Sequence, residues 1–415
     1  MGQILTVAIA WSVAFVGSLT LTLLAKKMAW KFGAISKPDG ERRLHAQPIA
    51  LGGGSAVYLA ALLSVAAVFL LTSHVVEDKV PAALALSAGM LCLLGFYDDL
   101  RDMSVRWKLL GQIVCTLPVL MAGCCVGRVV LFGHSFEMGL LGIAWTVGWL
   151  VLGTNALNLL DGMDGLASLI GIVISVAVGA IAATQARPQV MLLAFALAGA
   201  LAGFLVHNRP PARVYLGDSG SMVIGFTLAL LALRVSLAPM TPQTTNPTIL
   251  VALLFVPLMD TTLAIVRRTL KGLNFTVADH SHIHHQLLKR GLRTWHVLGV
   301  LGGVSLTTGV VAWWVAVRGQ ELWGWVALAT VTIILANRQL LGQEEWSLTK
   351  RLLSQTALPL LGRLLSVRLL PGLRSSSDRP RPVVEPEELA GPEALRVRRP
   401  PAEAEANPTE TRKAA

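Results

Sequence analysis

The sequence predicts an all-α integral membrane protein with about 11 transmembrane helices. Two observations predict this fold class. Hydrophobic residues make up 54% of the 415 residues and charged residues only 14%, with a mean hydropathy of +0.62, whereas soluble domains carry roughly 25% charged residues. Apolar segments of about 20 residues, the length that crosses a bilayer, also recur along the chain.

The apolar segments define the expected helices in order. The fourth, eighth and eleventh have the weakest signal. The candidates cover residues 3–25, 51–73, 80–97, 109–127, 138–155, 165–185, 188–206, 219–237, 248–266, 295–317 and 322–338. They form one polytopic membrane domain, 1–340, which is followed by a juxtamembrane amphipathic segment, 341–370. Residues 371–415 are rich in Pro, Glu, Arg, Ala and Ser, a composition typical of a disordered tail.

The distribution of Lys and Arg predicts how the chain lies in the cell membrane. Of the 35 Lys and Arg residues, 17 fall in loops on one side and 13 in the C-terminal tail, against five on the other side. By the positive-inside rule, the N-terminus is outside, the C-terminus is cytoplasmic, and the acidic loops face the cytoplasm. The net charge of +11 then reflects loops beside anionic lipid headgroups, and no nucleic-acid partner is expected.

A pair of carboxylates ends the third apolar segment. No charge occurs from Val80 to Tyr97, and Asp98 and Asp99 then follow directly. The simpler interpretation is a solvated helix end, but two acids are unfavourable beside the negative end of a helix dipole. Adjacent carboxylates can hold Mg²⁺ or supply a general base. Lys108 and Gln112, four residues apart, place a cation and an amide on one face of the next helix.

Further polar side chains follow at helix ends. Asn155, Asn158, Asp161 and Asp164 step by three, so on a helix they drift slowly around one side. These side chains can form hydrogen bonds with a base or a ribose. Alternatively, Asp164 can simply cap the next helix. Asp218 stands in Gly217-Asp218-Ser219-Gly220, where capping competes with metal binding.

The last third of the membrane domain contains an isolated aspartate and a histidine-rich loop. Asp260 lies inside an otherwise apolar segment and is expected to support a site formed by other residues. The loop that follows holds four of the nine histidines, including His282, His284 and His285. Zinc is an unfavoured interpretation, because the His-Glu spacing and Cys partners of zinc sites are missing. Imidazoles can instead donate hydrogen bonds to a diphosphate and a sugar.

With these motifs in order, residues 35–292 resemble the polyprenyl-phosphate N-acetylhexosamine-1-phosphate transferase family. The resemblance rests on Lys37-Pro38-Asp39 through Arg43, His45, Pro48 and Gly52-Gly53, on Asp98-Asp99 with Lys108 and Gln112, on Asn155 through Gly165, on Asn208 through Gly220, and on the histidine loop. Each motif is weak by itself, but five in this order are specific.

The resemblance implies an activity and a set of site residues. Such enzymes move a sugar 1-phosphate from a UDP-sugar to a polyprenyl phosphate in the inner leaflet and release UMP. Asp98 or Asp99 is implied as base or orienting acid, and Asp218, with Asp99, as ligand of Mg²⁺ or of Mn²⁺ in its place. The residues implied in substrate binding are His45, Lys108, Asn158, Asp161, Asp164, Asn208, Tyr215, His282, His284 and His285.

The histidine loop also separates branches of the family. His282-Ile283-His284-His285-Gln286 is similar to the branch that uses UDP-N-acetylglucosamine or a related UDP-HexNAc, whereas the muramoyl-pentapeptide branch has three consecutive histidines and then an acid. Tyr215 replaces the usual Phe. His280 replaces the usual Arg, which leaves one phosphate or sugar contact, and hence the exact sugar, open. The rivals are the muramoyl-pentapeptide reaction and an ion-coupled transporter, which would keep its acids near the bilayer midplane. A homodimer is left open.

Overall fold

The computed structural model describes residues 2–36, 48–72, 78–237, 243–272 and 282–337. All of them belong to one compact unit, Met1–Leu353. His45, the first part of the histidine loop and both predicted C-terminal segments lie outside the described residues.

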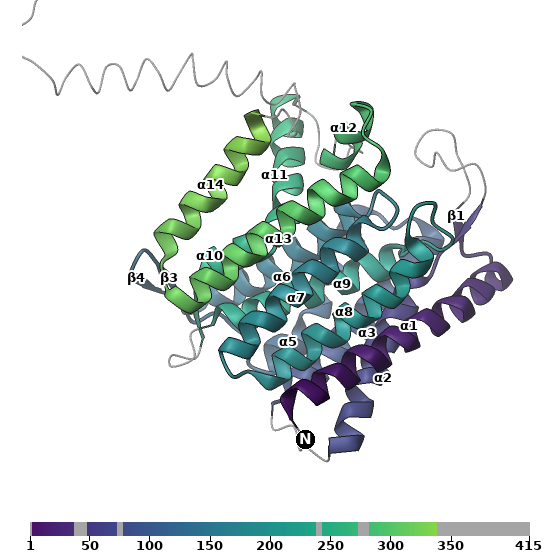
Figure 1. Ribbon diagram of the computed structural model, residues 1–415, viewed down its shortest axis with the longest axis horizontal. Helices are drawn as coiled ribbons and strands as arrows, with labels where there is room; N and C mark the ends of the chain where they lie inside the picture. Colours follow the sequence, from purple (N-terminus) through teal and green to yellow (C-terminus); the bar gives the residue numbers. More distant parts are fainter. Residues whose placement is uncertain (1, 37–47, 73–77, 238–242, 273–281, 338–415) are drawn as a thin grey trace, which may run out of the picture. The chain divides into compact units, whose positions relative to one another are not determined.

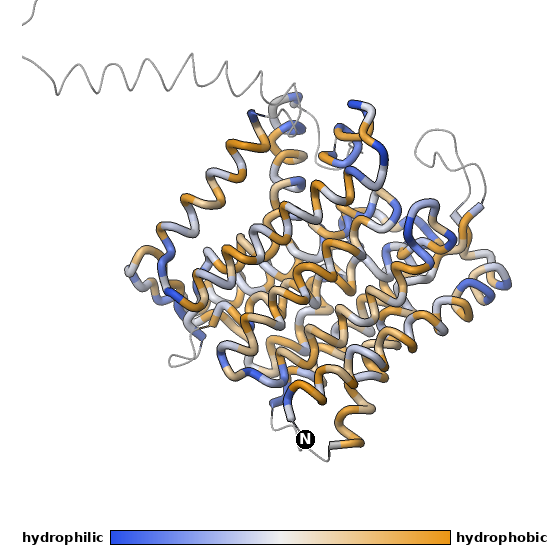
Figure 2. Tube along the Cα trace, in the orientation of Figure 1, coloured by the Kyte–Doolittle hydropathy of each residue, from blue (hydrophilic) through white to orange (hydrophobic). Residues whose placement is uncertain are grey.

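Helices dominate the described chain, as predicted. Eight of the described helices are long and apolar enough to cross a membrane. They are α1 (Gln3–Phe32), α2 (Gly53–Thr72), α3 (Val80–Arg101), α6 (Leu141–Leu160), α7 (Leu166–Thr184), α8 (Pro188–Asn208), α9 (Asp218–Ser236) and α13 (Thr294–Arg318). Figure 1 shows these helices side by side, and Figure 2 shows that apolar residues cover most of their length while polar residues gather at the turns.

Proline divides two of the predicted spans. Residues 248–266 form α10 (Pro247–Leu253) and α11 (Phe255–Leu270), which are bent by 86° and count as a ninth span if taken together. The ring of Pro257 conflicts with the carbonyl four residues earlier, that of Leu253, where α10 ends. Pro118 has the same relation to Val114 near the break between α4 (Val105–Cys115) and α5 (Leu117–Met121).

The remaining helices are short. They are α12 (Ile283–Lys289), which follows the histidine loop, and α14 (Glu321–Asn337), a shorter apolar helix at the last predicted span. The count of eleven spans therefore stays a prediction, since some of the candidates are broken or short.

Short strands, which the sequence did not predict, occur at the two ends of the helix bundle. β1 (Ile35–Ser36) pairs antiparallel with β2 (Ile49–Ala50). A second sheet has the order β4-β3-β5 and consists of β4 (His134–Glu137), β3 (Arg128–Leu131) and β5 (Thr244–Thr245). Figure 1 shows β1 and α12 on one side of the bundle and β3 and β4 on the other.

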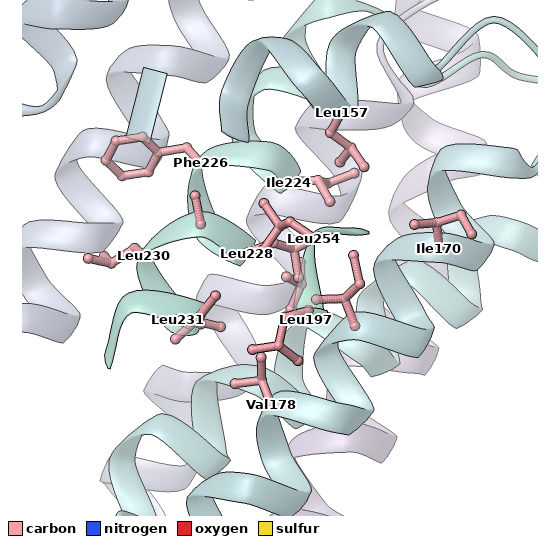
Figure 3. Close-up of a cluster of buried hydrophobic side chains, with 14 of the residues drawn as sticks. Leu157, Ile170, Val178, Leu197, Ile224, Phe226, Leu228, Leu230, Leu231 and Leu254 are labelled. Carbon is pink, nitrogen blue, oxygen red and sulfur yellow. The ribbon is translucent and has the colours of Figure 1, made fainter. Parts of the chain in front are cut away.

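The eighth predicted span, α9, lies at the centre of the bundle. Its membrane window is 94% buried, and it packs against α2, α3, α6, α7 and α8. Phe226 and Leu230 of α9 join Leu157 of α6 and Ile170 of α7 in one buried apolar cluster (Figure 3). Lipid is as apolar as these side chains, so close van der Waals packing, rather than escape from water, stabilises such contacts.

Glycines allow the backbones around α9 to approach closely. A Cβ atom on Gly225 would lie 2.6 Å from the carbonyl oxygen of Gly153 in α6. At the start of α9, a Cβ on Gly95 of α3 would lie 2.5 Å from Ser219 N, and one on Gly54 of α2 would overlap the backbone of Gly220. The ends of α2 and α3 are therefore held directly against the first turn of α9, where Asp218 lies.

Candidate active site

Lys108 occupies the centre of a polar network formed at one end of the bundle. Its Nζ atom lies 2.8 Å from Asp98 Oδ2, 2.6 Å from Asp218 Oδ2 and 3.4 Å from Asn158 Oδ1. These partners belong to α3, α9 and α6. Burial alone would lower the pKa of Lys108, but the carboxylates of Asp218 and Asp98 outweigh it and raise that pKa. Lys108 is therefore a permanent cation that joins three helix ends.

Asn158 holds the other face of the Asp218 carboxylate. Its Nδ2 donates to Asp218 Oδ1 at 2.7 Å and lies 2.7 Å from Ser221 Oγ. Ser221 stands three residues after Asp218 on the same helix and was not among the predicted site residues. One face of α6 and the first turn of α9 thus fix the Asp218 side chain from both sides.

Asp99 is bound to the backbone of the same first turn. Its Oδ1 accepts from Asp218 N at 2.8 Å and its Oδ2 from Ser219 N at 3.3 Å. Gly217 has a φ of +73°, and a Cβ atom there would lie 2.6 Å from Asp99 Oδ2. A carboxylate beside the positive end of a helix dipole is stabilised. Asp99 thus caps α9 from a neighbouring helix, a contact that sequence alone does not reveal.

Asp161 is the unsatisfied carboxylate of the group. Within the described parts of the chain, no side chain or backbone amide donates a hydrogen bond to it. Burial, and then the carboxylates of Asp218, Asp99 and Asp164, raise the pKa of Asp161 well above its usual range. Among the described residues that form the pocket, Lys108 therefore stands among several carboxylates, and their charges sum to a negative value.

The loop between α8 and α9 lies against the loop that follows α6. Asp164 Oδ2 accepts from Ala212 N at 2.9 Å. Asn208 is buried, accepts from Gly165 N at 3.0 Å and donates to Val214 O at 3.0 Å. Tyr215 is half-buried in the same loop, and burial together with Asp164 and Asp161 raises its pKa to about 12. Through these hydrogen bonds, Asp164 and Asn208 hold together the two loops that form the floor of the pocket.

The histidines approach the pocket from α12. A Cβ atom on Gly162, the neighbour of Asp161, would lie 2.6 Å from His284 Nε2. His284 is fully buried, and burial and the neighbouring His285 lower its pKa to about 3. The rings of His282 and His284 stack with centroids 5.9 Å apart, and those of His284 and His285 lie 4.2 Å apart. The predicted histidine residues and the Asp161 loop are thus adjacent.

The side chains of the pocket that can act as metal ligands indicate which metal ion would fit. Among the described residues, no group of three or more His, Cys, Asp or Glu side chains is assembled to hold a metal ion. Mg²⁺ does not require such a cage, because it keeps several waters and takes one or two carboxylates together with substrate phosphates. Asp218 and Asp161, whose carboxylates lie close enough to interact electrostatically, would supply oxygen ligands of this kind. The residues present therefore fit Mg²⁺.

Comparison with known proteins identifies the family. The model of glycosyl transferase family 4 matches residues 81–236, which include every carboxylate of the pocket. The decaprenyl-phosphate N-acetylglucosaminephosphotransferase of Mycobacterium tuberculosis is 32% identical over 321 residues, covering 69% of this chain and 76% of that protein. The chain belongs to glycosyl transferase family 4. The predicted family membership is thereby confirmed.

Other relatives in glycosyl transferase family 4 agree. The undecaprenyl-phosphate alpha-N-acetylglucosaminyl 1-phosphate transferase of Escherichia coli K12 is 30% identical over 75% of this chain and 85% of its own length. A probable undecaprenyl-phosphate N-acetylglucosaminyl 1-phosphate transferase of Bacillus subtilis is 28% identical over 82% of this chain and 92% of its own length. All three relatives carry names of the branch that the histidine loop predicted.

Proposed function

We propose that the protein transfers a HexNAc 1-phosphate, with GlcNAc 1-phosphate as the leading candidate, from a UDP-sugar to a membrane polyprenyl phosphate. The product is a polyprenyl-diphosphate-linked sugar, and UMP is released, so the reaction starts a cell-surface glycan. The observation that carries this proposal is the network around Lys108, in which Asp98, Asp218 and Asn158 converge from separate helices. These residues lie within the part of the chain that matches the family model.

The reaction exchanges one phosphoanhydride for another. An oxygen of the lipid phosphate forms a bond to the β-phosphorus of the UDP-sugar, and the bond to the oxygen that bridges the α- and β-phosphorus atoms breaks. UMP leaves with that oxygen and its charge. Because the bond formed and the bond broken are of the same type, no further energy source is needed. The protein then contributes positioning and electrostatic stabilisation.

Mg²⁺, or Mn²⁺ in its place, would be held by Asp218 and Asp161. A bound divalent cation would neutralise the negative charge of the reacting phosphates. Lys108 stands beside Asp218 and adds a fixed positive charge to the same place. The family resemblance implies Asp99 together with Asp218 as metal ligands. We instead favour Asp161 as the second ligand, because no described residue donates to its carboxylate, whereas Asp99 is bound to the backbone of α9.

Asp98 and Asp99 then orient the site rather than remove a proton. Asp98 is buried, pairs with Lys108, and accepts from Met103 N at 2.7 Å. Asp99 holds the first turn of α9. A base in this reaction must be free to reach a proton on the lipid phosphate, and neither carboxylate is free of protein partners. Of the two roles predicted for the pair, we therefore choose the orienting role.

The remaining predicted residues would surround the nucleotide and the sugar. Tyr215, His282, His284 and His285 would contact the donor, and Asp164 and Asn208 would hold the loops that form its floor. His45 belongs to the same proposal from the sequence alone. The chain lies in the cell membrane with about 11 spans, an outside N-terminus, a cytoplasmic C-terminus and a pocket open to the cytoplasm. This orientation follows from the basic loops.

The test is an assay with purified protein, polyprenyl phosphate, Mg²⁺ and a panel of UDP-sugars, with the lipid product identified by mass. We expect UMP release together with a lipid heavier by one HexNAc 1-phosphate. A lipid product that carries a muramoyl pentapeptide would support the rival branch. UMP release without any new lipid product would contradict the proposal.

A further inference from the structure

Asp260 is a carboxylate buried within a membrane helix. It lies in α11 among apolar residues, and only 1% of its surface is exposed. An ionisable group at such a position is costly and is retained where it serves a function. Its two oxygens have separate partners: Oδ2 lies 2.9 Å from His282 Nδ1, and Oδ1 accepts from Ile283 N at 2.9 Å.

These two contacts fix the start of α12. His282 is the N-cap residue of α12, but its own side chain makes no capping hydrogen bond. Asp260 supplies the missing acceptor from another helix by binding the first amide of α12. An ionised carboxylate only accepts hydrogen bonds, so His282 must present a proton at Nδ1, and its Nε2 is left to face other groups.

The contacts of the His282 ring lead towards the pocket. His282 stacks on His284 with an interplanar angle of 8°. His284 is fully buried, and neither of its ring nitrogens has a hydrogen-bond partner among the residues that the structure describes. A Cβ atom on Gly162, the neighbour of Asp161, would lie 2.6 Å from the Nε2 of His284. Asp260, the two rings and the carboxylate loop are therefore successive neighbours.

We propose that Asp260 is a positioning residue for the sugar-nucleotide donor, which acts through His282. It sets the tautomer and orientation of that ring and so holds the histidine loop against the Asp161 loop. This inference rests on the proposed function for its kinetic consequences, but the contact itself can be tested without turnover.

The substitution Asp260→Asn provides the test because it preserves volume. Ile283 N–H can only donate, so the single amide oxygen must face it, and the amide NH₂ then points at His282 Nδ1. The ring must give up its Nδ1 proton and take the other tautomer. Spectra of ¹⁵N-labelled histidine should therefore show His282, assigned with His282→Asn, changing from the Nδ1–H to the Nε2–H form. An unchanged tautomer would overturn the inference, whether or not the protein is active.

The kinetic consequence separates positioning from stability. Asp260→Asn should raise KM for the UDP-sugar by about tenfold and leave KM for polyprenyl phosphate within about twofold. The matched control is Asp78→Asn, which removes an acid paired with Arg234 at the opposite end of the bundle and should change neither constant. Equal changes in both KM values, or the same result from the control, would reduce Asp260 to a general structural role.

A double-mutant cycle tests whether Asp260 acts through His282. In a His282→Ala background, Asp260→Asn should change KM for the UDP-sugar by less than about twofold. Fully multiplicative effects would show that the two residues act independently and would overturn the inference. If the wild-type protein releases no UMP, the proposed function fails, and the histidine spectra still decide the role of Asp260.

Discussion

The two ends of the helix bundle differ in how their charged side chains are partnered. At the end with β3 and β4, Arg234 Nη2 pairs with Asp78 Oδ2 at 2.7 Å, and Arg187 donates to the carbonyl oxygens of Arg234 and Leu237. Gln185 donates to the carbonyl oxygen of Val235 nearby at 2.8 Å. These hydrogen bonds close the C-terminal end of α9, although Arg234 Nε and Gln185 Oε1 have no partner among the described residues.

At the other end of α9, the residues that the structure describes leave negative charge uncompensated. Lys108 serves both Asp98 and Asp218, while Asp161 receives no hydrogen bond from the residues that the structure describes. Unpaired carboxylates in such a pocket destabilise the folded protein unless a cation neutralises their charge. The comparison teaches that buried charge by itself does not mark a site. Carboxylates that outnumber their described partners indicate a site, because a further cation must balance them.

The largest expected difference between the two ends concerns catalysis. Asp218→Asn should lower kcat by about 10²–10³-fold, because it removes a charge that holds both Lys108 and the cation. Asp78→Asn should leave kcat within about threefold and lower the melting temperature instead, since it breaks an internal ion pair. Rates of UMP release and thermal unfolding of both variants measure this. Near-normal activity of Asp218→Asn would remove that residue from the metal site.

The next effect tests the close packing that creates the pocket. Gly54→Ala would force a methyl group into the backbone of Gly220, and we expect a loss of about 1–3 kcal/mol of stability together with reduced activity. Gly148→Ala in α6 is the control, because nothing lies within 4 Å of its added Cβ. Equal stability of the two variants in thermal unfolding would show that the approach of α2 to α9 is not needed.

A smaller effect is expected for the residue that holds Asp218 from the side. Asn158→Ala removes its hydrogen bonds with Asp218 and Ser221, and each lost hydrogen bond to a charged group costs about 1.5–3 kcal/mol. We expect the KM for the UDP-sugar to rise by about tenfold. Initial rates over a range of both substrates measure the change. A change confined to the KM for the polyprenyl phosphate would refute the assignment of Asn158 to the nucleotide side.

The smallest effect is a pH dependence of the metal requirement. The raised pKa of Asp161 means that its carboxyl keeps a proton at a higher pH than a free aspartate. Protons compete with Mg²⁺ for this group, so affinity for the metal weakens as pH falls toward that pKa and strengthens as pH rises. The half-saturating Mg²⁺ concentration should therefore decrease as the pH of the assay is raised. A constant value would argue against Asp161 as a ligand.

Much of this organisation could be predicted from the sequence, and the rest depends on contacts that no local pattern contains. Long apolar runs predict the main helices, and positions of acids after such runs predict one polar end. The break at Leu254 was missed although Pro257 signals it, because the run is apolar throughout. The capping of α9 by Asp99 could not be predicted, since it requires the backbones of α3 and α9 to meet at Gly95.

The central claim is that separate helix ends form one carboxylate-rich pocket for a divalent cation. Titration of the purified protein with Mn²⁺, followed by electron paramagnetic resonance, tests it most directly. We predict one tightly bound Mn²⁺ per chain that disappears in Asp218→Asn and in Asp161→Asn but persists in Asp78→Asn. Stoichiometric binding that survives both of the first two substitutions would contradict the account.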